Sequence, residues 1–201
     1  MLDLSKFNFP KKKTEILSTA TELFQKFGIR RITVEEICQK AGVSKMTFYK
    51  YFKNKNDLVR FMWGKGFEQA LEKFDEVKAM DIPFENKLQL MLKIKEESTT
   101  KISHEFAIDY FYATPDLKSF FEELSHKSIT RFLDFIKEAQ NRGEVRRDIH
   151  PEFLLAIINN IKLLVKDDTL VSNYPTYKDF VMEINNFIFF GILPRPNSEV
   201  S

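Results

Sequence analysis

The sequence predicts an all-α protein of about nine helices, with an N-terminal three-helix helix-turn-helix head that continues into a larger helical body. Apolar residues recur at three- and four-residue spacings along most of the chain, which is the period of a helix with one buried face. Only six Gly and seven Pro interrupt the 201 residues, so long helices are expected. Hydrophobic residues make up 43% of the chain, which is enough for a packed core.

The first helix is expected over residues 11–27. Its apolar residues form one stripe, made of Ile16, Leu17, Ala20, Leu23, Phe24 and Phe27. Gly28 follows at the position where a left-handed C-terminal cap is expected. Thr33 and Glu36 then make the capping-box pattern T-x-x-E, which predicts the start of the second helix.

A tight turn is predicted at Ala41-Gly42-Val43, because alanine lets two helices approach closely and glycine tolerates a positive φ. Ser44 is a typical N-cap for a third helix that extends to about residue 51. Both short helices and the turn lie within residues 33–55, which end in a lysine-rich segment. This order is typical of a helix-turn-helix.

Similar start and stop signals divide the rest of the chain. Asn54 is a typical N-cap, Pro83 and Pro115 suit the starts of helices, and Gly143 suits a helix end. We expect further helices over residues 54–78, 83–100, 102–113, 115–143, 151–165 and 176–190. Since no linker separates head from body, we expect one domain over residues 1–54 and a second over residues 55–201, continuous through a helix.

Charge is distributed unevenly along the chain. Residues 1–60 contain 13 Lys and Arg against 6 Asp and Glu, whereas residues 61–201 contain 18 against 23. A basic head on an acidic body favours a polyanion such as nucleic acid as the partner of the head. A basic surface that is merely solvated would give the same bias.

The cysteine content and the apolar runs indicate the compartment. A single cysteine, Cys38, excludes an internal disulfide and fits a reducing environment. No apolar run reaches the roughly 18–20 residues of a membrane span, and the N-terminus lacks the charge order of a secretory signal. We therefore expect a cytoplasmic protein without membrane contact. For Cys38 a small core residue is favoured over a redox sensor, because no second cysteine could resolve it.

The side chains of the third helix suit the surface of DNA. A short helix with an exposed N-terminus can enter the major groove, where base edges offer donors and acceptors. Lys45 and Lys50 can reach guanine acceptors or phosphates, and Met46 can contact a thymine methyl group. Thr47 and Tyr49 supply hydroxyl groups for phosphates or base edges.

With these residues the stretch resembles the DNA-binding domain of the TetR family of bacterial repressors. The resemblance covers about residues 11–60 and includes Thr33-Val-x-x-Ile37 and the run from Ala41 to Leu58. It implies that a DNA surface is formed by Thr33, Ser44, Lys45, Met46, Thr47, Tyr49, Lys50, Tyr51 and Lys55.

Within this surface the resemblance also assigns roles. Thr47, Tyr51 and Lys55 would mainly contact the DNA backbone. Lys45, Met46 and Tyr49 would mainly contact bases. Met46 departs from the family pattern, since many relatives have Gly or Pro there, and no operator sequence can therefore be transferred to this chain.

The body lacks the sequence patterns of common enzymes: it has no G-x-S-x-G, P-loop, G-x-G-x-x-G or H-E-x-x-H motif and no Cys/His cluster. We therefore expect no enzyme activity, no catalytic residue, no metal and no cofactor. Glu105 and Asp109 lie one helical turn apart beside His104 and could serve a ligand. A solvated helix face is the commoner explanation of such a pair.

Phenylalanine is unusually frequent, with 21 residues. Core packing is the ordinary explanation for aromatics at helical spacing. Alternatively, some of these side chains wall an apolar cavity for a ligand, and the candidates are Phe106, Tyr110, Phe111, Phe120 and Phe121. The TetR resemblance implies such an effector cavity, which typically receives small, often lipophilic molecules.

The last two helices, over residues 151–165 and 176–190, are too apolar to hide all of their surface within one subunit. The simplest partner is the same pair from a second copy, packed as a four-helix bundle with twofold symmetry. Asn159, Asn160, Asn185 and Asn186 could fix the register of this bundle. Dimerisation also suits the head, because two recognition helices in successive major grooves read a palindrome.

The sequence therefore predicts a homodimeric transcriptional repressor that binds a palindromic operator in double-stranded DNA. An unidentified small-molecule effector in the body would release it by acting through the fourth helix. The alternative is a small-molecule or protein-binding adaptor of the same fold that does not bind DNA.

Overall fold

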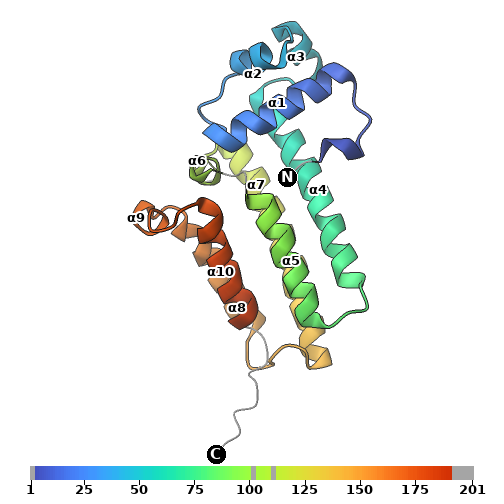
Figure 1. Ribbon diagram of the computed structural model, residues 1–201, viewed down its shortest axis with the longest axis vertical. Coiled ribbons are helices and arrows are strands. Elements are labelled where there is room, and N and C mark those ends of the chain that lie inside the picture. The colour runs from blue at the N-terminus through green and yellow to red at the C-terminus, as the bar shows by residue number, and fades with distance from the viewer. Residues whose placement is uncertain (1–2, 101–102, 110–111, 192–201) are drawn as a thin grey trace, which may run out of the picture. The chain divides into compact units, whose positions relative to one another are not determined.

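The computed structural model describes residues 3–100, 103–109 and 112–191. Within these ranges the regular structure is helical and there is no β-strand (Figure 1). The elements are η1 (Leu4–Lys6, a 3-10 helix), α1 (Lys11–Phe27), α2 (Val34–Ala41), α3 (Lys45–Tyr51), α4 (Lys55–Ala79), α5 (Phe84–Thr99), α6 (His104–Ile108), α7 (Pro115–Arg142), α8 (Pro151–Leu164), α9 (Asp168–Val171) and α10 (Tyr177–Gly191). The predicted all-α class is confirmed.

Two of these elements, η1 and α9, are not expected from the sequence. The side chain of Asp167 closes the single turn of α9 by accepting a hydrogen bond from Leu170 N at 3.0 Å. Asp3 caps η1 in the same way, accepting from Ser5 N at 3.0 Å. Turns this short bury too little apolar surface to leave a helical period in the sequence.

Helix α6 corrects the helix predicted over residues 102–113. Its described part spans only His104–Ile108, and Asp109 follows as the C-cap. Ser103 begins the helix, since its Oγ accepts a hydrogen bond from Phe106 N at 3.2 Å. Tyr112 lies in a turn outside any helix. The N–H of Asp109 closes the last turn by donating to Glu105 O at 3.2 Å, and its side chain is bound by a different segment of the chain.

Contacts divide the chain into two compact units. The first comprises residues 1–73 and 101–125, and the second comprises residues 74–100 and 126–201. Along the chain, the boundary between units falls inside α4, after α5 and again inside α7. The functional division into a DNA-binding part, residues 1–54, and an effector-binding and dimerisation part, residues 55–201, stays a prediction.

The first unit is built around α1. Helices α2 and α3 pack against α1 and against each other, and α6 packs against α1 (Figure 1). The largest buried side chains of this core are Ile16, Leu17, Phe24, Ile32, Ile37, Phe48 and Leu58. The apolar stripe predicted for residues 11–27 is therefore the face that α1 turns toward the helix-turn-helix.

The second unit has a separate core. Its buried side chains come from α5, α7, α8 and the α7–α8 connection: Phe84, Leu88, Phe135, Ile136, Ala139, Val145 and Leu154. Helix α5 also packs against α10. Among the described residues, no helix is both long enough and apolar enough to cross a membrane.

Candidate nucleic-acid interface

Side-chain and backbone caps define the helix-turn-helix. Thr33 Oγ1 accepts a hydrogen bond from Glu36 N at 3.2 Å, and Glu36 Oε2 accepts one from Thr33 N at 2.7 Å. Gly42 closes α2 with a left-handed backbone, at φ +62°. Ser44 Oγ then accepts from Thr47 N at 3.1 Å and caps α3. The capping box, the glycine turn and the serine cap predicted from the sequence are all confirmed.

Helix α3 separates its side chains into a core face and a solvent face. Phe48 is fully buried, whereas Met46 is 84% exposed and Tyr49 is 53% exposed. Lys45 and Lys50 are exposed as well. A single exposed apolar side chain needs no explanation by itself, but Met46 lies between two lysines on the same short helix and beside the exposed Tyr49. The solvent face of α3 thus combines positive charge with apolar and hydroxyl contacts.

The remaining predicted contact residues border this face. Thr33 and Ser44 are exposed, while Thr47, Tyr51 and Lys55 are half-buried. Phe52, which follows α3, is buried in the core. All nine predicted DNA-binding residues belong to the first unit. Their contact with DNA stays a prediction.

Lys45 already has a partner on α2. Its ammonium group forms an ion pair with the carboxylate of Glu35. The hydrogen bond from Lys45 lowers the pKa of Glu35, and the same bond raises the pKa of Lys45. Both side chains are more than half exposed, so the pair contributes little to stability. DNA that recruits Lys45 would have to compete with Glu35.

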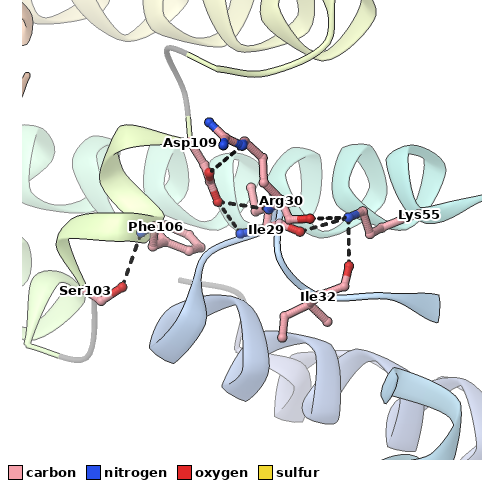
Figure 2. Close-up of polar contacts among 7 residues, drawn as sticks. All are labelled: Ile29, Arg30, Ile32, Lys55, Ser103, Phe106 and Asp109. Carbon is pink, nitrogen blue, oxygen red and sulfur yellow. Dashed lines mark hydrogen bonds and ion pairs between the residues drawn. The ribbon is translucent and has the colours of Figure 1, made fainter. Parts of the chain in front are cut away.

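Lys55 is bound by the loop that joins α1 to α2. Its Nζ donates to the carbonyl oxygens of Ile29 at 2.9 Å, Arg30 at 3.2 Å and Ile32 at 2.7 Å (Figure 2). Partial burial lowers the pKa of Lys55, and the charge of Asp109 opposes that change. An ammonium group has three N–H donors, so these carbonyls can use all of them. The sequence did not indicate this structural role, and the phosphate contact of Lys55 stays a prediction.

The carboxylate of Asp109 binds two backbone amides of the same loop (Figure 2). Its Oδ2 accepts hydrogen bonds from Ile29 N and, at 3.1 Å, from Arg30 N. Asp109 is only 6% exposed, so the solvated helix face suggested by the sequence is wrong for this residue. Its partners lie 80 residues away in the chain, and no local spacing could have indicated them.

Cys38 lies in the core under α2 and is 4% exposed. Burial raises the pKa of its thiol, and the negative charge of Glu35 adds to that effect. A buried, protonated thiol is a poor nucleophile. The structure therefore supports the core residue favoured from the sequence.

Three of the aromatic residues proposed as cavity walls, Phe106, Phe120 and Phe121, gather around Trp63, which no sequence pattern had marked. The Trp63 ring stacks on Phe106, with centroids 5.1 Å apart, and lies 5.6 Å from Phe121. Phe120 contacts Phe121 at 5.8 Å. These rings belong to or pack against the core of the first unit. Tyr110 and Phe111 lie outside the described residues, and the effector cavity stays a prediction.

The last two long helices, α8 and α10, carry an exposed apolar surface. Large apolar side chains are exposed along α8 and α10, namely Phe153, Leu163, Leu164, Phe187 and Phe190. The amides of Asn160 and Asn185 donate to carbonyl oxygens of their own helices, at 2.8 Å to Ala156 and 2.7 Å to Val181. In the described part of the chain, no three His, Cys, Asp or Glu side chains gather in a way that could hold a metal ion.

Comparison with known proteins agrees with this geometry. Residues 16–62 match the family described as bacterial regulatory proteins, tetR family. The uncharacterized HTH-type transcriptional regulator YhgD of Bacillus subtilis is 29% identical over 134 residues, which are 66% of this chain and 69% of the relative. The fatty acid metabolism regulator protein of the same organism is 30% identical over 97 residues, which are 48% of this chain and 50% of that protein.

A solved structure shares the fold over nearly the whole chain. The transcriptional regulator FadR from Bacillus subtilis, in complex with stearoyl-CoA, aligns with a TM-score of 0.69 and 19% identity. The alignment covers 90% of this chain and 99% of that chain. At this level of identity the likeness establishes the common fold.

Proposed function

We infer the function of this chain from its family: it belongs to the tetR family of bacterial regulatory proteins, and it is a DNA-binding transcriptional regulator. We propose that it acts as a homodimeric repressor of a palindromic operator. The observation that carries the proposal is the solvent face of α3. There Met46 and Tyr49 stand exposed beside two lysines, while Phe48 anchors the helix in the core.

The proposed DNA surface divides into two groups of residues. Lys45, Met46 and Tyr49 contact bases from the exposed face of α3. Contacts that position the head on the DNA backbone come from Thr33, Ser44, Thr47, Lys50, Tyr51 and Lys55. A phosphate contact by Lys55 replaces one of its three hydrogen bonds to loop carbonyls. Glu35 competes with phosphate and guanine for Lys45, so this carboxylate contributes to specificity by weakening unmatched contacts.

The proposed dimer forms through α8 and α10. Phe153, Leu163 and Phe187 are each more than half exposed in the single chain. Apolar surface of this kind is stabilised when a second copy covers it. Twofold symmetry would then present two α3 helices to successive half-sites of one operator.

The proposed effector is a small lipophilic molecule that releases the repressor. Phe106, Tyr110, Phe111, Phe120 and Phe121 are the proposed cavity residues. A fatty acyl-CoA is the first compound to test, because one relative is a fatty acid metabolism regulator and a protein of the same fold was solved with stearoyl-CoA. A long acyl chain also suits a phenylalanine-rich interior.

The proposal requires neither catalysis nor a cofactor. Members of the family are transcriptional regulators, and we propose that this chain likewise has no enzyme activity. Its partners are DNA, a second copy and the effector, with no membrane among them. Since bacterial operators lie in the cytoplasm, the protein acts there.

The test is selection of duplex DNA from a random-sequence pool by the full-length protein. We expect enrichment of one palindrome, bound with an affinity that falls steeply as salt rises. Stearoyl-CoA should release the protein from that duplex, with free coenzyme A as the control. Failure to enrich any sequence would favour the adaptor function instead. Enrichment without release by stearoyl-CoA would overturn only the choice of effector.

A further inference from the structure

The loop over residues 28–32, which joins α1 to α2, is bound from two sides by opposite charges. Its amides at Ile29 and Arg30 point to the carboxylate of Asp109. Its carbonyls at Ile29, Arg30 and Ile32 point to the ammonium group of Lys55. In Figure 2 the loop lies between these two side chains. Neither charge belongs to α1 or α2, so both fix the loop from outside.

Gly28 makes room for the carboxylate. Its backbone has φ +77°, which L side chains rarely adopt. A Cβ at this position would lie 2.6 Å from Asp109 Oδ2 and 3.4 Å from the backbone carbon of Glu105. The close approach between the loop and α6 therefore depends on glycine in two independent ways.

Helix α6 holds Asp109 at the end of α1. At its start, Ser103 N donates to Gln25 O in the last turn of α1 at 3.0 Å. At its end, Asp109 binds the loop that follows α1. The guanidinium of Arg30 closes over the site, 4.0 Å from Asp109 Oδ1 and stacked 4.9 Å from the ring of Tyr112. The carboxylate is thus shielded from water on the loop side.

The position of this loop determines where the helix-turn-helix begins. Thr33 follows directly after Ile32 and is the N-cap of α2, and α3 comes after one short turn. Apolar packing against α1 is non-directional and tolerates small rotations. Charge-assisted hydrogen bonds to backbone groups have a defined geometry. The bonds from Asp109 therefore supply orientation that the core alone does not.

We propose that Asp109 is a positioning residue for DNA recognition: its carboxylate, bound by the amides of Ile29 and Arg30, sets the orientation of α2 and α3 for sequence-specific contact. This rests on the proposed DNA-binding function. Asp109 does not touch DNA. Its loss lowers specific affinity while the positive surface responsible for non-specific binding is retained.

The experiment compares full-length variants on two duplexes, the palindrome selected by the wild-type protein and a scrambled duplex of equal length. Asp109→Asn removes the charge and keeps the shape. Asp116→Asn is the matched control, since the carboxylate of Asp116 accepts from Arg60 Nε at 3.1 Å in the same unit without touching the loop. Thermal unfolding and the DNA-binding active fraction are measured for each variant.

For Asp109→Asn we expect affinity for the palindrome to fall by roughly tenfold or more, because two hydrogen bonds to a charged group are weakened. Affinity for the scrambled duplex should stay within about twofold, since it depends on surface charge. Asp116→Asn should match the wild type on both duplexes.

Three results would overturn the proposal. In the first, Asp109→Asn binds the palindrome as the wild type does. In the second, it loses affinity for both duplexes in parallel, which is the mark of a purely stabilising residue. In the third, Asp116→Asn shows the same selective loss. If Asp109→Asn does not fold, Asp109→Glu is the second variant. It keeps the charge and displaces the carboxylate by one methylene group, and the same comparison of the two duplexes applies to it. A wild-type protein that selects no palindrome would instead overturn the DNA-binding function itself.

Discussion

Phe48 and Tyr49 are neighbours in α3 with opposite environments. Phe48 is fully buried against α1, while more than half of the Tyr49 side chain is exposed. Phe48 meets Tyr49 edge-on, with ring centroids 5.4 Å apart. One ring therefore anchors the helix and supports the other at the surface. The period of the helix, together with the cap at Ser44, is sufficient to explain this arrangement.

The first prediction separates base contact from phosphate contact on α3. Lys50→Ala should lower the slope of log K against log salt by about one unit, because one phosphate contact is lost. Met46→Ala should leave that slope unchanged and relax the base preference at one position of each half-site. Fluorescence anisotropy at several salt concentrations measures both effects.

Lys118→Ala is the control for this experiment, since Lys118 is an exposed lysine of α7. It should change neither the slope nor the preference. A loss of slope with Met46→Ala and none with Lys50→Ala would contradict the assigned roles.

The second prediction concerns the capping box at acid pH. Hydrogen bonds from the backbone N–H and the hydroxyl of Thr33 lower the pKa of Glu36. The native state therefore favours the carboxylate, and its contribution to stability is present above the usual glutamate range. It is lost as the pH falls through the lowered native pKa. Thermal midpoints measured from pH 5 to pH 3 should fall less steeply for Glu36→Gln, which keeps the cap but cannot titrate.

Glu36→Gln also removes one negative charge from the surface, and this general effect needs its own control. Glu76→Gln, at an exposed position of α4, serves this purpose. If Glu36→Gln follows the wild-type pH dependence, the capping carboxylate does not contribute to acid sensitivity.

At the scale of elements, helix α4 contains two glycines, Gly64 and Gly66, in its interior. Glycine in a helix interior costs about 1 kcal/mol relative to alanine. A Cβ at Gly64 would make an ordinary contact, 3.9 Å from Phe120 Cζ. The part of α4 beside Trp63 is therefore less stable than it would be with alanine at these two positions. This local weakness lies in the helix through which the chain passes from the first unit to the second.

The third prediction uses the same substitution at two glycines with opposite expected signs. Gly64→Ala should raise the free energy of unfolding by about 0.5–1 kcal/mol, because helix propensity improves without a clash. Gly42→Ala should lower it by about 1 kcal/mol, because φ +62° is strained for alanine although the space is open. Urea unfolding measures both. Equal signs would show that the backbone conformation at Gly42 is not retained.

At the scale of the whole molecule, the apolar faces of α8 and α10 bear on assembly. Phe187 is 74% exposed in the single chain and lies in the C-terminal half of α10, which is rich in apolar residues. An exposed phenylalanine on its own needs no explanation, but Phe153, Leu163 and Phe190 accompany it on the same two helices. Together they favour a surface that a second copy covers.

The fourth prediction tests this surface. Phe187→Asp should convert the dimer into a monomer, because an unpaired carboxylate would be buried in the interface. The monomer should bind the full palindrome at least roughly 100-fold more weakly, since the two heads no longer act together. Light scattering gives the mass and anisotropy gives the affinity.

Met80→Asp is the matched control, because Met80 is an exposed apolar residue outside α8 and α10. It should remain dimeric. A dimeric Phe187→Asp variant would place the interface elsewhere on the chain.

The sequence by itself determined the all-α class, the helix-turn-helix, its caps at Thr33 and Ser44, and the core position of Phe48. These features depend on interactions within a few residues, so their patterns are visible along the chain. The single turn of α9 and the early end of α6 were not predictable, since such short elements carry no period.

Only the tertiary structure decided what holds the helix-turn-helix in place. Asp109 reaches the amides of Ile29 and Arg30 across 80 and 79 residues of chain. Lys55 reaches carbonyls 23 to 26 residues away. In the sequence these are two unrelated charged residues, 54 positions apart, and neither spacing nor composition links them. Folding buries Asp109 and half-buries Lys55, and the backbone of one loop becomes the partner of both. A charge that loses its water must be satisfied by the polar groups that packing brings within reach.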